Sequence, residues 1–203
     1  MFNLMKKDFI IQKVQIIFFI PFIIFISIFA DLFSPALVFM MAGAYIPING
    51  IHFDALVNSN ILLNSLPYTR KEIVAAKYIG ALVYMLLSIT AAGITLVLFN
   101  YNYSIADIAI AVGLSLILIA MVFPLFYLLN PAYLGAVILI SLAIMAAIMP
   151  SIIQYIVHNV TEFTDFLSSL STATIYLSGA IISVSFFMIS WLISLYIYKN
   201  KVF

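Results

Sequence analysis

Long apolar runs without a charged residue constrain this chain more than any other feature of its sequence. No Asp, Glu, Lys or Arg lies between Lys77 and Asp107, between Asp107 and Glu162, or between Asp165 and Lys199. Runs of about 20 apolar residues are long enough to cross the hydrocarbon core of a bilayer as helices. A helix satisfies its own backbone hydrogen bonds, which a segment surrounded by lipid must do. The sequence therefore predicts an all-α membrane protein.

Six apolar segments and two polar ones divide the chain. We expect a single transmembrane domain over residues 1–203, with an interfacial amphipathic helix at 1–13 and a cytoplasmic segment at 52–72, between the second and third spans. Only Asn130-Pro131 separates the fourth span from the fifth, so a kinked or re-entrant pair is the alternative there. The expected spans are residues 14–30, 33–51, 73–99, 108–129, 132–157 and 172–198.

The distribution of charge sets the expected orientation. With six spans and a cytoplasmic N-terminus, all eight cationic residues fall on the cytoplasmic side of the membrane. Asp31, Asp107, Glu162 and Asp165 fall outside, with no cation among them. This pattern obeys the positive-inside rule, and an odd number of spans would break it. We therefore expect both termini in the cytoplasm, and a net charge of +1 argues against nucleic acid as a partner.

The N-terminal segment has a basic face. At helical spacing Lys6, Lys7 and Lys13 share one stripe, and Phe9 lies on the opposite side. A short basic amphipathic helix before a span is typical of a helix that lies in the membrane interface, with its lysines toward lipid headgroups. A frayed, positively charged tail is the alternative, and we favour the interfacial helix.

The polar segment at residues 52–72 contains a structured hinge. Pro67 forces a break, because the residue before a proline, here Leu66, is pushed out of the helical region. Thr69 and Glu72 then form a capping box, in which each side chain bonds the free backbone N–H of the other residue. We expect a short segment that ends at Pro67, and a new helix that begins at Thr69 and continues into the third span.

The sequence lacks the residues needed for nucleotide binding, thiolate chemistry, a metal site shared by its two histidines, and ion coupling. It contains no P-loop motif, so we expect no nucleotide site on this chain, and no cysteine, so thiolate chemistry is excluded. His52 and His158 fall on opposite membrane faces in the expected topology and cannot share a metal ion. The middle of each expected span holds hydroxyl groups rather than the ionisable residue that ion-coupled transporters need, and we assign these to helix–helix hydrogen bonds. Energy for transport must then come from another subunit.

The chain resembles the small ABC-2 type transporter permeases of Gram-positive bacteria. It shares with them a basic N-terminal helix, six spans, and a cytoplasmic segment between the second and third spans. Within that family it looks most like the permeases of the phenol-soluble modulin exporter, which expel amphipathic toxin peptides. The signature of the family is carried here by Leu66, Pro67, Thr69, Arg70, Lys71, Ile73, Val74, Lys77 and Tyr78.

The resemblance implies a function and partners. Such permeases have no catalytic or cofactor site of their own. They sit in the plasma membrane, pair with an identical or paralogous permease, and bind two separate ATPase subunits that bind and hydrolyse ATP. They export hydrophobic or amphipathic substrates, here expected to be a peptide. The interfacial helix, with Lys6, Lys7, Phe9 and Lys13, and a coupling helix rest on the ATPase. The expected coupling residues are Asp54, Leu56, Leu62, Leu63, Leu66, Pro67, Thr69, Arg70, Lys71 and Glu72.

Two other classes of function stay open at the level of sequence. A membrane protein that confers immunity to a peptide, or senses it, would need neither a structured hinge nor an ATPase partner. An integral membrane enzyme would need a catalytic constellation, and the sequence contains no HExxH motif, no GxSxG motif and no paired carboxylates within a span. We favour the exporter subunit over both alternatives.

Overall fold

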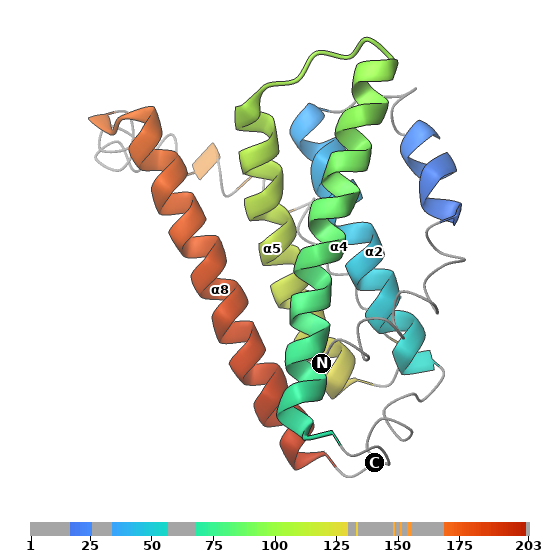
Figure 1. The fold of residues 1–203 in the computed structure, drawn as a ribbon. Helices are drawn as coiled ribbons and strands as arrows, with labels where there is room; N and C mark the ends of the chain where they lie inside the picture. The colour runs from blue at the N-terminus through green and yellow to red at the C-terminus, as the bar shows by residue number, and fades with distance from the viewer. Residues whose placement is uncertain are drawn as a thin grey trace.

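The structure is a computed structural model, which describes residues 17–25, 34–56, 68–129, 133, 148, 151, 154–155 and 169–201. All regular structure in this part of the chain is helical, which confirms the expected all-α class. Residues 17–25 form a helix that precedes the four long helices (Figure 1). The long helices are α2 (Pro35–Leu56), α4 (Arg70–Leu98), α5 (Ile105–Leu128) and α8 (Thr172–Asn200).

All four long helices are long and apolar enough to cross a membrane. They coincide with the expected second, third, fourth and sixth spans. Residues 17–25 lie within the expected first span, whose two ends lie outside the described residues, as does most of the expected fifth span. The six-span arrangement therefore stays a prediction. Two helices begin or end further into the polar connections than expected. α2 continues through Pro47 to Leu56, and α5 begins at Ile105.

The four helices give the bundle two distinct ends. α4 begins at the same end at which α2, α5 and α8 finish, and we call this the Arg70 end (Figure 1). At the opposite end, α4 finishes and α5 begins within a few residues of Ser104, and we call this the Ser104 end. The expected topology places the Arg70 end in the cytoplasm, because the basic residues gather there.

α5 is the central helix of the described bundle. It packs against α2 on one side and against α8 on the other, and α4 packs mainly against α2. α8 runs obliquely and lies nearest to α4 at the Arg70 end (Figure 1). The close approach of α2 to α5 depends on Gly43, since a Cβ atom there would lie 2.9 Å from the hydroxyl oxygen of Ser115. That hydroxyl donates to the carbonyl of Met40, so a small residue and a hydroxyl together join two spans.

The helix ends follow local capping rules. Thr69 and Glu72 form the capping box that the sequence predicts, which confirms the expected start of α4. Ser104 and Asp107 form a second box at the start of α5. α4 ends at Leu98 with Phe99 as its C-cap, and the next residue, Asn100, has a φ of 56° and donates its N–H to the carbonyl of Val97. Asparagine is among the few residues that adopt this left-handed conformation readily, so it closes the helix at low cost.

Candidate functional site

The expected coupling segment lies between α2 and α4, and the structure describes both of its ends. Asp54 and Leu56 belong to the last turn of α2, and Thr69 to Glu72 form the start of α4. Residues 57–67 lie outside the described residues. The coupling residues Leu62, Leu63, Leu66 and Pro67, and the interfacial residues Lys6, Lys7, Phe9 and Lys13, therefore stay predictions.

The first end of the segment is fixed by a buried ion pair. The ammonium group of Lys77, in the second turn of α4, donates to a carboxylate oxygen of Asp54 in α2. The side chains of the two residues are only 11% and 9% exposed. Two charges withdrawn from water must be paired, because an isolated buried charge costs several kcal/mol. The pair therefore holds the end of α2 against α4 and brings the two ends of the coupling segment together.

The second end of the segment is fixed by Arg70, the first residue of α4. Its guanidinium nitrogen Nη1 donates to the backbone carbonyls of Tyr198 at 3.3 Å, Lys199 at 2.5 Å and Lys201 at 3.2 Å. The last carbonyls of a helix have no partner within that helix and carry its negative partial charge. The guanidinium of Arg70 supplies hydrogen-bond donors to these carbonyls, and its positive charge stabilises the negative end of α8. Arg70 therefore joins the start of α4 directly to the end of α8, and its contact with Lys199 spans 129 residues of the sequence.

Lys201 extends this connection to α5. It is the C-cap residue of α8, and its ammonium group donates to the carbonyl of Tyr127 at 2.7 Å, in the last turn of α5. The rings of Tyr127 and Tyr198 pack edge to face beside it, with centroids 5.3 Å apart. α4, α8 and α5 are thus connected in series at the Arg70 end.

A second polar connection lies deeper in the bundle. The hydroxyl of Tyr78 in α4 lies 2.7 Å from those of Ser190 and Ser194 in α8. The hydroxyl of Ser190 donates in turn to the carbonyl of Ala120 in α5 at 2.6 Å. The ring of Tyr78 packs edge to face against Phe123. The expectation that hydroxyls in the spans bond between helices is thus confirmed for Ser190 and Ser115. It is wrong for Ser88, Thr90, Thr95 and Ser183, whose hydroxyls donate to carbonyls of their own helices.

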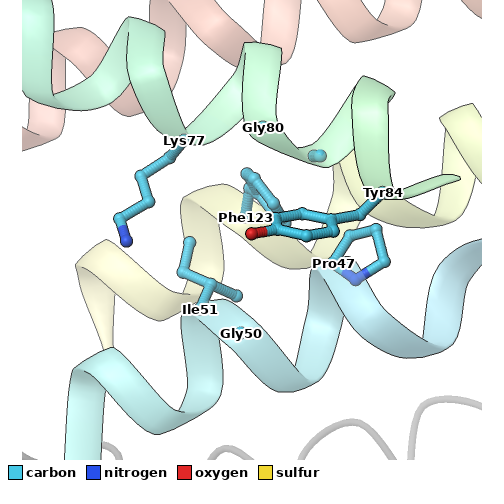
Figure 2. Close-up of a pocket in the computed structure, with 8 residues that line it drawn as sticks. Pro47, Gly50, Ile51, Lys77, Gly80, Tyr84 and Phe123 are labelled. Atoms are coloured by element: carbon cyan, nitrogen blue, oxygen red, sulfur yellow. The ribbon is translucent and has the colours of Figure 1, made fainter. Parts of the chain in front are cut away.

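A small cavity lies beside the ion pair, between α2, α4 and α5. Figure 2 shows Pro47 and Ile51 of α2 facing Tyr84 of α4 and Phe123 of α5, with Lys77 at one side. Its volume is about 10 Å³, close to the least that one water molecule needs. The cavity is therefore too small for a substrate. Pro47 cannot donate the usual backbone hydrogen bond, so this part of α2 is held less tightly than the rest of the helix.

The carboxylates at the helix starts are tuned by their caps. The backbone N–H of Thr69, followed by its hydroxyl, lowers the pKa of Glu72 below its ordinary value. The hydroxyl of Ser104, followed by its backbone N–H, does the same for Asp107. Both carboxylates are therefore charged at neutral pH, and each accepts a hydrogen bond from the backbone N–H of its N-cap residue. Among the described residues, no group of three His, Asp or Glu side chains could hold a metal ion.

Sequence reasoning found some of these residues and missed others. Arg70 and Asp54 were expected to contact an ATPase, and the structure shows that each is also engaged within the bundle. Lys77 was part of the signature but was assigned no role. A signal for its pairing was available, since an ionisable residue within an apolar helix needs a partner on the same membrane face. Lys201 had no local signal, because the carbonyl that it contacts lies 74 residues away in the sequence.

Comparison with known proteins points to one family. The model of the family described as "ABC-2 family transporter protein" matches residues 3–199, which is nearly the whole chain. No curated protein and no solved structure matches the chain. The family match covers all four long helices and both ends of the segment that joins α2 to α4.

Proposed function

Because the chain belongs to the ABC-2 family of transporter proteins, we propose that it is the membrane-spanning permease subunit of an ATP-binding-cassette exporter. In this proposal a separate ATPase subunit binds and hydrolyses ATP. The permease pairs with a second permease and moves an amphipathic or hydrophobic substrate, a peptide, outward across the plasma membrane of a bacterium. The apolar helices and the family together make the chain an integral membrane protein.

The observation that carries the proposal is the attachment of both ends of the segment between α2 and α4. Asp54 and Lys77 fix its first end, and Arg70 fixes its second end to the last carbonyls of α8. A connection that served only to link two spans would need no such attachment. A segment that receives a force needs it, because a displacement is transmitted only through rigid, connected elements.

The contacts suggest how a displacement would travel. The capping box of Thr69 and Glu72 starts α4 sharply, so a push on residues 57–67 acts on a regular helix rather than on a frayed one. Arg70 would pass the movement to α8, and Lys201 would pass it to α5. Closure of the ATPase pair on ATP would thus tilt three spans together. We propose that the substrate path opens between the two permeases as these spans move.

The chain's own residues are consistent with dependence on a partner for energy. The sequence has no P-loop, and the buried ionisable residues that the structure describes pair with each other at the Arg70 end. A proton-driven or sodium-driven pump would need an ionisable residue on its transport path. In the described helices the polar groups away from the ends are hydroxyls that bond backbone carbonyls or one another.

The decisive experiment is co-purification with candidate ATPases from neighbouring reading frames, followed by measurement of ATP hydrolysis with and without amphipathic peptides. We expect a stable complex whose hydrolysis responds to peptide, and no hydrolysis by the isolated chain. A permease-free ATPase with the same peptide response would refute the proposal. A chain that binds peptide but no ATPase would identify an immunity or sensor protein instead.

A pair of variants tests the coupling segment itself. Leu62→Asp places a charge in the segment that we expect to rest on the ATPase, and a buried unpaired charge costs several kcal/mol. We expect this variant to insert normally but to lose ATPase association and export. Asn102→Asp, at the Ser104 end, is the matched control and should be nearly silent. Export by Leu62→Asp at the normal rate would show that the coupling assignment is wrong.

A further inference from the structure

A groove between α4 and α8 opens at the surface of the described helices near the Arg70 end. It has a volume of about 730 Å³. Its walls are apolar, formed by Ile79 and Leu82 of α4 and by Met188 and Leu192 of α8. Ile79, Met188 and Leu192 are each about half exposed, so the groove presents hydrocarbon surface that no other described residue covers. In a bilayer such a surface is in contact with acyl chains or with another protein.

The rim of the groove carries charge at one end only. Lys71 and Lys199 lie at the Arg70 end of the groove, and both side chains are exposed. Neither ammonium group forms an ion pair with another described residue. Glu72 also lies on the rim, but its carboxylate accepts hydrogen bonds from the backbone and hydroxyl of Thr69. The rim therefore offers two available cations beside a carboxylate that is already engaged.

We propose that this groove is a binding site for an anionic phospholipid of the leaflet at the Arg70 end. The headgroup phosphate would lie between Lys71 and Lys199, and an acyl chain would lie along Ile79, Leu82 and Leu192. Basic residues beside a groove between membrane helices suit this chemistry, because they attract an anionic headgroup while the apolar walls accept its tails. The charge complementarity at the rim distinguishes such a lipid from a zwitterionic one.

The site lies beside the Arg70 connection. Lys71 follows Arg70 directly in α4, and Lys199 supplies one of the carbonyls that Arg70 contacts. A phosphate that bridges the two lysines would therefore reinforce the same joint between α4 and α8. It would also neutralise two cations of like charge that line the same groove.

The only tryptophan of the chain, Trp191, lines this groove and supplies a direct probe. Its indole nitrogen is buried and has no hydrogen-bond partner among the described residues. Bromine atoms on an acyl chain quench tryptophan fluorescence on contact. The full-length protein can thus be reconstituted in bilayers that contain either brominated phosphatidylglycerol or brominated phosphatidylcholine at equal mole fraction.

We expect brominated phosphatidylglycerol to quench Trp191 with an apparent affinity about 25-fold above that of brominated phosphatidylcholine, since each of the two lysines near the anionic headgroup contributes roughly a fivefold preference. Lys71→Gln/Lys199→Gln should abolish the preference, and Lys71→Arg/Lys199→Arg should retain it. Lys6→Gln/Lys7→Gln removes the same charge from the same expected membrane face and should also retain it. A Trp191→Phe/Ile94→Trp variant, with its indole near the Ser104 end, should show no preference.

Three results would overturn the site. Equal quenching by the two lipids in the unmodified protein would mean that the groove does not select headgroups. Loss of preference in Lys6→Gln/Lys7→Gln to the same extent would assign the attraction to the basic face as a whole. Absence of quenching by either lipid would mean that protein covers the groove, from a second copy or from elsewhere in the chain. None of these measurements depends on an ATPase or on export.

Discussion

The two ends of the helical bundle are built in different ways. At the Ser104 end, the starts of α5 and α8 are capped by residues next to them in sequence: Ser104 bonds Asp107, and Ser171 accepts from the N–H of Thr174. At the Arg70 end, the start of α4 also has a local box, but the ends of α8 and α5 are capped by other helices, through Arg70 and Lys201 respectively. Local caps stabilise a helix without fixing it to its neighbours. Caps between helices join their positions, so a movement of one must displace the others.

Among the variants that compare the two ends, those of the ion pair between Asp54 and Lys77 should change the stability of the protein most. Asp54→Asn or Lys77→Met removes one charge of this buried ion pair, which we expect to destabilise the protein by about 3–5 kcal/mol. Thermal unfolding in detergent measures this loss. The double variant Asp54→Asn/Lys77→Met should recover a large part of it. If the double variant is as unstable as the sum of the two single variants, the pair does not interact as the structure indicates.

The next largest effect is expected at Arg70. Arg70→Met removes hydrogen bonds from a charged group to the end of α8, and we expect a loss of about 1.5–3 kcal/mol in stability. The larger consequence should be functional. Peptide control of ATP hydrolysis should disappear, because α4 would move without α8. Arg70→Lys keeps the charge but offers fewer fixed donors, so it should retain part of the control.

A separate measurement tells coupling from docking in the Arg70 variant. Arg70→Met should still co-purify with the ATPase, since its side chain is engaged with α8 rather than directed away from the bundle. Loss of co-purification would instead place Arg70 on the ATPase surface, as the resemblance alone implied. Normal export by Arg70→Met would show that the joint between α4 and α8 is not on the coupling path.

A matched pair of caps compares the two ends directly. Thr69→Ala and Ser104→Ala each remove the N-cap of one capping box, and each should cost about 1 kcal/mol of stability. Only Thr69→Ala should also weaken peptide-controlled ATP hydrolysis, because only the start of α4 follows the coupling segment. Equal functional losses in the two variants would mean that helix stability alone limits transport. In that case the Arg70 end has no special role.

Contacts of short range can be predicted from the sequence, although the box of Ser104 and Asp107 was missed. The capping box of Thr69 and Glu72 was predicted correctly, because its partners are three residues apart and the motif determines their geometry. The helical class followed from the apolar runs. The extension of α2 to Leu56 was not expected, because the apolar run was taken to end at Ile51 and the polar residues after it were assigned to the cytoplasmic segment.

The connections at the Arg70 end could not be read from the sequence. The contact between Arg70 and Lys199 spans 129 residues, and its acceptor is a backbone carbonyl, which every residue has. Nothing in the letters of the chain distinguishes that carbonyl from any other. The charges themselves were visible, and the positive-inside rule placed them at one membrane face. Which of them contact helices and which remain available for lipid or protein depends on packing.

The smallest expected effect is a loss of stability at acid pH, to which a carboxylate at each end of the bundle contributes. The caps lower the pKa of Glu72 and of Asp107 in the folded protein, from ordinary values of 4.5 and 3.8. A group whose pKa is depressed on folding adds stability above its unfolded pKa, and that stability is lost as the pH falls through the folded pKa. Stability should therefore decline slightly as the pH falls below about 4.5, and each carboxylate should contribute to the decline. Thermal unfolding of Glu72→Gln and Asp107→Asn over this range should show a shallower decline in each variant.

At neutral pH, Glu72→Gln should also weaken peptide control of ATP hydrolysis, whereas Asp107→Asn should leave it unchanged. If both variants behave alike in the hydrolysis assay, the cap at the start of α4 is only structural, and the difference between the two ends rests on Arg70 and Lys201 alone.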